Sequence, residues 1–284
     1  MIKRQKLFIL FVTLFFAAIC CCVYNYKYEE TETRFYSAVS INQLEIRTSN
    51  GNIAVGSIKD TTSSPHPIPI MFTAVITKYC SGRNRDDAMQ AIKDIVITED
   101  SGDSKLQLKA EIPGGPRTYG ASFDILVPDS NSTGLDLNTT NGNVAVYSIT
   151  ADIDVNTSNG KISLTNTCGN ATLFTSNGNV NIQTHNGSIK THTTNGSIEC
   201  NLSEFNATDS AGLETTNGSL QLYLPTDVSA SIDAYTTNGS ISISGFSSIS
   251  YQEHSRTRVR CRIGSGTSII AVKTTNGNIT IRSR

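Results

Sequence analysis

Apolar and polar residues alternate along most of the second half of the chain, and each run of alternation ends at a turn. Around each turn the order is apolar-x-apolar-x-Thr-x-Asn-Gly-x-apolar-x-apolar, and Asn-Gly occurs nine times in 284 residues. Strict alternation places every second side chain on one face, which predicts β-strands with one buried face. The recurrence of one phrase also indicates a repeat architecture. The phrase is Thr-Thr-Asn-Gly at 139–142, 193–196, 215–218, 236–239 and 274–277, and Thr-Ser-Asn-Gly at 48–51, 157–160 and 175–178.

The spacing of the turns favours one of two architectures. Asn141, Asn159, Asn177, Asn186 and Asn195 are separated by steps of 18, 18, 9 and 9 residues. A chain of β-hairpins would explain the Asn-Gly turns, because both residues tolerate positive φ. A hairpin chain needs no fixed period, however, whereas stacked coils require their corners in register. We therefore predict an all-β parallel solenoid with two strands, two corners and about 18 residues per coil.

This period predicts which residues stack. From Gly134 the coils are expected to run to the C-terminus as one continuous stack. Ile198 should lie in the core between Val180 and Leu220, and Glu199 should face solvent, because a slip of one residue would exchange the two faces. At one corner the asparagines should form a ladder along the axis, made by Asn141, Asn159, Asn177, Asn195, Asn217, Asn238 and Asn276.

The first half of the chain departs from the repeat. The copy of the phrase at 48–51 predicts an initial coil, and residues 59–133 then form a non-repeat insertion that would cap an exposed sheet edge. We assign 27–39 to a polar, charged tether and 40–284 to the solenoid domain. Within the insertion, apolar residues at helical spacing predict one helix at 83–94, and alternation predicts strands at 70–77, 94–98, 105–112 and 122–127.

Residues 1–26 have the pattern of a membrane-targeting segment. Three basic residues among the first six precede an uncharged apolar run at 7–23, whose 17 residues are at the lower limit for spanning a bilayer. The basic flank predicts that the rest of the chain is exported, so we expect a membrane-anchored, extracytoplasmic protein at the cell surface or in the periplasm. A cleaved signal peptide is the alternative. The candidate lipidation sites at the end of the run are Cys20, Cys21 and Cys22.

Composition narrows the classes of protein that fit. The net charge is −1, and without Lys3, Arg4 and Lys6 the chain has 20 basic and 24 acidic groups. No basic field therefore indicates nucleic-acid binding. Four cysteines outside the anchor could form disulfides in three alternative pairings, although the last two of them also fit inward strand positions as small apolar residues. The four are Cys80, Cys168, Cys200 and Cys261.

The repeated T-[ST]-N-G-[NSK]-[IVL] phrase resembles a known family. Its early single copy at 48–53, the helix-bearing insertion and the strand at 122–127 followed by Pro128 fit the same family. This is the bacterial and archaeal "putative adhesin" family, also called the toastrack domain, and the resemblance extends from Ser40 to the end. It implies a right-handed parallel β-helix outside the cell membrane, often tethered and associated with envelope sensing or adhesion. The family has no established catalytic residues, so none is transferred to this chain.

Few residues have the spacing of a chemical site. Asp136 and Asp154 fall at equivalent outward positions on adjacent rungs, which resembles the separation of a retaining glycosidase pair, but two solvated carboxylates on a flat sheet are the simpler interpretation. The corners offer Asn and Thr instead of the Asp that calcium-binding repeats require, so we expect no metal and no other cofactor. His185 and His192 have no partners at metal-ligand spacing and are interpreted as isolated, solvated histidines.

Four arginines alternate near the C-terminus and would all point outward from one strand. Such a strip could hold an anionic polymer, lipid headgroups or carboxylates. A solubilising stripe that discourages strand aggregation is the plainer alternative. The candidate residues are Arg256, Arg258, Arg260 and Arg262.

These patterns predict a non-enzymatic, membrane-tethered, extracytoplasmic β-solenoid that binds or senses the cell envelope, as an adhesin would. The expected partners are the membrane, through the N-terminal segment, and a cell-envelope polymer, glycan or surface protein. Two alternatives stay open. A polysaccharide-acting β-helix enzyme would need a carboxylate-lined cleft, and a structural module that assembles end to end would need an uncapped last coil.

Overall fold

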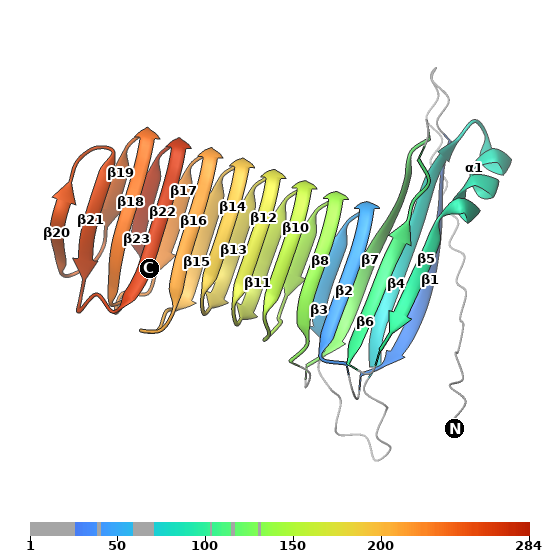
Figure 1. The fold of residues 1–284 in the computed structure, drawn as a ribbon, viewed down its shortest axis with the longest axis horizontal. Helices are drawn as coiled ribbons and strands as arrows, with labels where there is room; N and C mark the ends of the chain where they lie inside the picture. The colour runs from blue at the N-terminus through green and yellow to red at the C-terminus, as the bar shows by residue number, and fades with distance from the viewer. Residues whose placement is uncertain (1–25, 39–40, 59–70, 103, 115–116, 130–131) are drawn as a thin grey trace, which may run out of the picture. The chain divides into compact units, whose positions relative to one another are not determined.

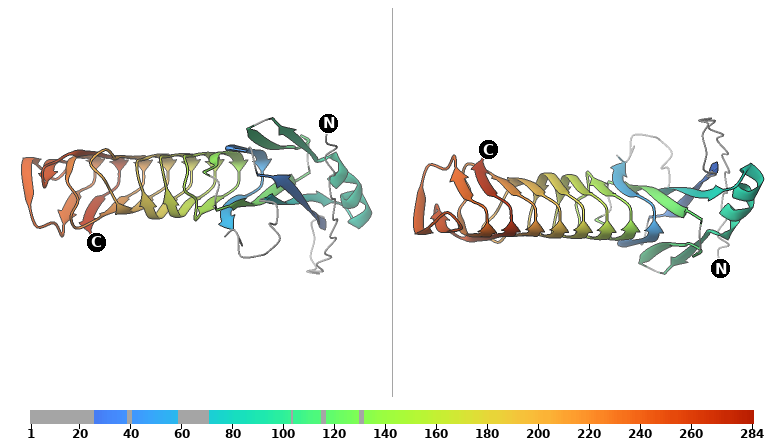
Figure 2. Two further views of the ribbon diagram at one scale, coloured as in Figure 1. Left: turned by 90° about the horizontal axis from the view of Figure 1, so that it is seen from below. Right: turned by 90° about the horizontal axis from the view of Figure 1, so that it is seen from above.

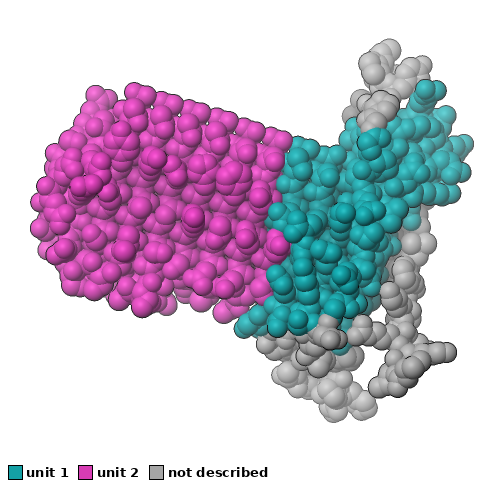
Figure 3. All heavy atoms as spheres, viewed as in Figure 1, with its two compact units in different colours: residues 1–133, 137–142 teal, residues 134–136, 143–284 magenta. Residues whose placement is uncertain are grey.

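We describe the fold from a computed structural model of the chain (Figure 1). The structure describes residues 26–38, 41–58, 71–102, 104–114, 117–129 and 132–284. They belong to two compact units, Met1–Thr133 with Leu137–Gly142 and Gly134–Asp136 with Asn143–Arg284 (Figure 3). Residues 1–25 of the predicted anchor at 1–26, including the three candidate lipidation sites, lie outside the described residues, whereas Tyr26 begins a strand. Within the described part, no helix has the length and apolar character needed to cross a membrane.

The strands of the second unit belong to two sheets, and between Val144 and Ser244 they alternate between these sheets along the chain (Figures 1 and 2). The first, here the β11 sheet, has the order β9 (Val144–Tyr147), β11 (Ile162–Cys168), β13 (Val180–Asn186), β15 (Ile198–Glu204), β17 (Leu220–Leu224), β23 (Ile279–Ser283) and β19 (Ile241–Ser244). The second, here the β12 sheet, has the order β10 (Ile153–Asn159), β12 (Ala171–Asn177), β14 (Ile189–Asn195), β16 (Ser210–Asn217), β22 (Ser268–Asn276), β18 (Ala230–Asn238), β21 (Arg258–Ile263) and β20 (Ile249–His254).

These strands form the predicted parallel β-solenoid. Val180 pairs with Ile198, and Ile198 pairs with Leu220, in the β11 sheet. Val180 and Ile198 are 18 residues apart, and the same offset relates β10 to β12 and β12 to β14 in the β12 sheet. Ile198 is fully buried, whereas Glu199 beside it is exposed. The predicted register is therefore confirmed, and the chain of hairpins is wrong for these coils.

The core of the second unit is a column of aliphatic side chains between the two sheets. Residues such as Val155, Leu173, Leu164 and Ile182 are at most 1% exposed. Burying one such side chain contributes roughly 1.5–3 kcal/mol. Each coil packs only on its neighbours, as in other repeat proteins, so stability is expected to accumulate coil by coil.

The C-terminal coil is not the last rung of this stack. β22 pairs in parallel with β16 on one side and with β18 on the other, and β23 likewise lies between β17 and β19. The expectation of a stack in chain order is therefore wrong for the last coils. The reason is that β21 pairs antiparallel with the outer edge of β18, so the inner edge of β18 is left for the coil that follows. The coil ending near Arg284 is internal.

The first unit has two sheets as well, with antiparallel strands added. One has the order β1 (Tyr26–Ser37), β4 (Met71–Gly82), β7 (Tyr119–Pro128) and β3 (Ile53–Ile58), and the other has the order β8 (Gly134–Asn141), β2 (Gln43–Asn50), β6 (Lys105–Glu111) and β5 (Val96–Ser101). The early copy of the repeat joins β2 to β3, as the predicted first coil requires. β6 and β7, from the predicted insertion, pair in parallel with β2 and β3.

Residues 27–39 are not a tether, which corrects the prediction for this segment. Most of them belong to β1, which pairs antiparallel with β4 along all 12 of its residues. The many charged residues of this segment mask the alternation that would predict a strand. Charged residues nevertheless suit an edge strand, because they discourage its pairing with other chains. The expected helix forms as α1 (Arg85–Ala91), followed by a 3-10 turn η1 (Ile92–Asp94). Asn84 caps α1 by accepting a hydrogen bond from the Asp87 backbone N–H.

Candidate functional site

The Asn-Gly corner is a structural feature rather than a ligand site. Each asparagine Nδ2 donates to the Oδ1 of the asparagine on the neighbouring rung at 2.8 Å, in the order Asn238, Asn276, Asn217, Asn195, Asn177 and Asn159. In the first unit, Asn141 makes the equivalent bond to Asn50 at 2.7 Å. Six of the seven predicted residues, from Asn159 to Asn276, thus form one ladder, in which Asn276 comes before Asn238 because the last coil is inserted.

The predicted arginine strip is partly neutralised in the structure. Arg256 precedes the strand, while the other three arginines lie on β21. Arg258 lies 3.1 Å from Asp233, and Arg260 lies 3.3 Å from the same carboxylate. Only the last member, Arg262, is an exposed strand arginine without an ion pair among the described residues. A continuous cationic strip of four residues is therefore not what the fold presents.

Outward side chains of the β12 sheet form a broader surface, which we call the aromatic–charged face. One row crosses six strands through direct Cα partners. Phe174 and His192 begin the row with stacked rings, 5.3 Å between centroids and 8° between planes. The row ends where Arg258 lies over the ring of Tyr235 at 5.8 Å. Its members are Phe174, His192, Glu214, Lys273, Tyr235 and Arg258.

Charges in the middle of this row are balanced. Lys273 Nζ lies 3.0 Å from Glu214 Oε1, and this hydrogen bond holds the pKa of Glu214 below its usual range. His192 Nδ1 lies 3.6 Å from the other oxygen of the same carboxylate. Beside the row, Gly212 leaves open space, because a Cβ there would meet no atom within 4 Å. Ile269 nearby is 66% exposed. The face therefore combines aromatic rings, hydrogen-bonding groups and open space at Gly212, which has no side chain.

The two aspartates singled out in the sequence lie on this same outward side. Burial, and secondly the charge of Asp136, raise the pKa of Asp154. A carboxyl whose pKa is raised by burial and by a neighbouring carboxylate is a feature that also occurs in catalytic sites. Asp154 is nevertheless solvent-exposed on the open sheet face.

His185 is not solvated, which corrects the prediction for this residue. Its side chain is fully buried, its Nδ1 lies 2.9 Å from Thr167 Oγ1, and burial lowers its pKa. The cause is Thr184, whose φ of 61° breaks the alternation of β13 and turns the next side chain inward. His192 is not isolated either, since it stacks on Phe174.

The cysteines and the metal prediction can be placed as well. All four described cysteines are free, so no disulfide pairing forms; the two in inward strand positions, Cys200 and Cys261, are buried. Burial raises the pKa of the Cys200 thiol, which makes it unreactive. Among the residues that the structure describes, no group of three or more His, Cys, Asp or Glu side chains is arranged to hold a metal ion.

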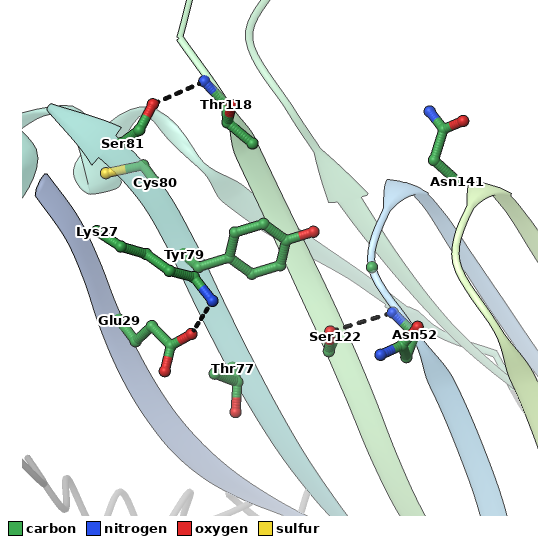
Figure 4. Close-up of a pocket in the computed structure, with 11 residues that line it drawn as sticks. Lys27, Glu29, Asn52, Thr77, Tyr79, Cys80, Ser81, Thr118, Ser122 and Asn141 are labelled. Carbon is green, nitrogen blue, oxygen red and sulfur yellow. Dashed lines mark hydrogen bonds and ion pairs between the residues drawn. The ribbon is translucent and has the colours of Figure 1, made fainter. Parts of the chain in front are cut away.

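A pocket of about 620 Å³ lies in the first unit, on the outer face of the sheet containing β1, β4 and β7 (Figure 4). Tyr79 crosses it over Gly120, where a Cβ would come within 2.1 Å of the ring. Lys27 Nζ lies 5.2 Å from the ring centroid and 2.6 Å from Glu29 Oε1. Burial raises the pKa of Tyr79. The pocket is thus lined mainly by polar residues and has one aromatic wall.

Comparison with known proteins gives the family. The family described as Toastrack DUF4097 matches residues 7–173 and 167–282, which together span nearly the whole chain. The chain belongs to the toastrack family. Two solved structures are similar to this toastrack chain. The first is a "putative cell adhesion protein" from Clostridium sporogenes ATCC 15579, with 11% identity, coverage of 90% of this chain and 100% of that chain, and a TM-score of 0.36. The second is a "putative adhesin" from Bacteroides fragilis NCTC 9343, with 16% identity, coverage of 90% of this chain and 97% of that chain, and a TM-score of 0.41. No curated protein matches the chain.

Sequence reasoning missed the aromatic part of the face on this toastrack protein. Phe174 and His192 are 18 residues apart, which is one predicted coil. Both occupy outward positions in the predicted register, so their stacking could have been found by aligning the coils. Tyr235 could not have been placed beside Lys273, because the inserted last coil separates neighbours in space from neighbours in sequence.

Proposed function

We propose that this toastrack protein is a non-enzymatic, extracytoplasmic binding module that is tethered to a membrane by its N-terminal segment. We propose further that its aromatic–charged face binds a glycan of the cell envelope. The observation that carries the proposal is the row of exposed rings and charged groups across adjacent strands, beginning at the Phe174–His192 stack.

The chemistry of a sugar polymer complements this row. A pyranose ring has an apolar C–H face, which packs on an aromatic ring, and a rim of hydroxyls, which exchange hydrogen bonds with carboxylates and ammonium groups. Phe174 is 40% exposed and Tyr235 is 37% exposed, so both rings can be reached. Because the rungs repeat about every 4.8 Å, an extended chain could make contacts on successive strands. Arg262 adds a cation for an anionic substituent.

A matched pair of variants tests the face. Phe174→Ala removes the first ring of the row, and Tyr147→Ala removes an exposed ring, 37% accessible, from the β11 sheet. Binding to purified cell-envelope polysaccharide is measured by titration calorimetry with both variants. We expect at least a tenfold weaker affinity for Phe174→Ala and unchanged affinity for Tyr147→Ala. Equal affinities for the two variants would show that the polysaccharide does not bind to this face.

The location is tested separately. The basic flank and the apolar run support a membrane tether with the C-terminal part outside the cytoplasm. Protease added to intact cells should digest a tag placed after Arg284, and the protein should fractionate with membranes. A tag that is protected until the cells are lysed contradicts this topology.

The raised pKa of Asp154 favours a test of the enzymatic alternative. If the Asp136–Asp154 pair hydrolysed a glycan, the wild-type protein would release reducing ends and Asp154→Asn would abolish the release. The proposed binding function instead predicts no release of reducing ends by either protein. Measurement of reducing ends over hours on the polysaccharide that binds separates the two functions.

A further inference from the structure

The C-terminal coil, residues 268–283, occupies an unusual place in the solenoid. Its strands β22 and β23 lie between β16 and β18 in one sheet and between β17 and β19 in the other. We call this place the insertion position. Both neighbours end in the same Thr-Thr-Asn-Gly phrase as the coil itself, at 215–218 and 236–239. In chain order the coil follows β18 and β19, although in the stack it lies inside them.

At the Asn-Gly corner, the coil is held by the same contacts as other rungs, and Lys273 adds an ion pair to Glu214 on β16. Thr274 Oγ1 donates to Gly218 O at 2.9 Å, and Thr236 Oγ1 donates to Gly277 O at 2.8 Å. The asparagine ladder passes through Asn276 with 2.8 Å bonds on both sides. These corner contacts would form in the same way if the coil came from a second copy of the protein, so an identical coil from another molecule would fit equally well.

The link to the coil has the properties of a hinge. Residues 264–267 cross the start of β18, since β21 and β22 flank that strand on its two sides. Gly264 and Gly266 have φ values of 60° and 72°, which glycine adopts without strain. Ser229 holds the link through its Oγ, 3.0 Å from Gly266 N and 2.6 Å from Ser265 Oγ. The bond to Ser265 is exposed and the bond to Gly266 is half-buried, and no residue of 264–267 is buried.

We propose that the C-terminal coil exchanges between two copies of this chain, each coil filling the insertion position of the other copy. Closed and exchanged forms have the same rung contacts and differ only in the link, which is the condition for domain swapping. The apolar residues Ile270, Val272, Ile279 and Ile281 are at most 1% exposed, so the coil must occupy one insertion position or the other. The partner is therefore a second copy, and the exchange does not depend on glycan binding.

Crosslinking between two differently labelled copies tests the exchange. One copy carries Gly212→Cys and the other carries Ala271→Cys, because these residues are Cα partners across β16 and β22. Both copies also carry Cys168→Ser, which removes a half-exposed native thiol. After refolding the copies together, a short thiol crosslinker should join them into a heterodimer. The control pair, Gln221→Cys with Ala271→Cys, places the thiols on opposite sheets and should remain uncrosslinked.

A change in the length of the link gives an independent test. Deletion of residues 265–267 leaves only Gly264 between β21 and β22, a span of at most ~7 Å. The crossing over β18 covers two strand spacings, about 9.6 Å. The coil of this variant cannot reach its own insertion position, so we expect a dimer by light scattering with a protease-resistant C-terminus. Insertion of four Gly/Ser residues should return the protein to the monomer.

The outcomes are decisive in both directions. A heterodimer for the 212/271 pair and a dimeric deletion variant support the exchange. No heterodimer beyond the control level, or a monomeric deletion variant whose C-terminal coil is digested, overturns it.

Discussion

The two corners of each coil in the second unit begin from similar sequences but differ in structure. At the corner between the β12 and β11 sheets, Asn195-Gly196 joins a ladder of identical residues. At the opposite corner, Asn186-Gly187 has the same dipeptide, yet Asn186 Oδ1 accepts a hydrogen bond from Ser203 Oγ. The Asn-Gly dipeptide therefore specifies a turn. A ladder forms only where the neighbouring rung also has an asparagine at the equivalent position.

The difference has a steric cause. Repeated corners lie so close together that a Cβ on Gly196 would come within 1.9 Å of Gly178 O. This distance leaves no space for an insertion or a longer side chain. The opposite corner is looser, and it contains the exposed residues 206–208 and the long excursion through β20 and β21. We call the two the fixed corner and the variable corner. Among the described coils of the second unit, length variation is confined to the variable corner.

The largest effect on stability is expected when a side chain is added to a glycine of the fixed corner. Gly196→Ala forces the backbone of two rungs apart and should lower the free energy of unfolding by about 3 kcal/mol. The control is Gly212→Ala, since a Cβ at Gly212 meets no atom within 4 Å and should change stability by less than about 0.5 kcal/mol. Urea denaturation of both variants measures the contrast. Similar midpoints would mean that the fixed corner is not tightly packed.

The buried threonines near the fixed corner should give the next largest effect. Thr193 Oγ1 donates to Gly178 O at 3.0 Å, and Thr193→Val should cost about 1–2 kcal/mol because that carbonyl loses its partner. Thr191 is equally buried, but its Oγ1 has no hydrogen-bond partner among the described residues. Thr191→Val should therefore be neutral or stabilising. A greater loss for Thr191→Val in the same denaturation experiment would contradict the hydrogen-bond assignment.

The variable corner should make stability depend on pH through His185. Burial lowers the pKa of His185 in the folded state, whereas the unfolded chain titrates near the ordinary value of about 6.5. The unfolded chain thus binds more protons just below that pH, so this contribution is complete above pH ~6.5 and is lost on acidification. Thermal melts between pH 5 and 8 should show a shallower slope for His185→Gln. Identical slopes would place the pH dependence elsewhere.

The smallest effect is expected from single ladder residues. Asn195 donates to Asn177 and accepts from Asn217, so Asn195→Ala removes two exposed bonds and should cost about 1 kcal/mol. Asn186→Ala removes the single bond from Ser203 at the variable corner and should cost less. Chemical denaturation of the two variants compares the corners directly. A larger loss at Asn186 would show that the ladder adds little to the turns themselves.

Contacts between consecutive coils could be predicted from the sequence. They require only that apolar residues alternate within each coil and that equivalent positions of the next coil follow at a regular spacing. This logic correctly placed Ile198 in the core and Glu199 in solvent. It failed where a single backbone angle reversed the alternation, as at Thr184, and where charged residues occupied an edge strand, as in β1. The candidate site was found only in part: three outward arginines were placed on their strand, but the acidic groups that pair with two of them were not.

By itself, the sequence determined the solenoid, its 18-residue period, its inward face and the residues of its ladder, since all of these follow from local pattern repeated at fixed spacing. Only the tertiary structure decided the order of the last coils and the composition of the aromatic–charged face. The phrases ending at Gly218, Gly239 and Gly277 are identical, so the pairing energy at the corners cannot favour one order of these coils over another. The antiparallel pairing of β21 with β18 removes that ambiguity, because it occupies one edge of β18 and leaves the other to β22.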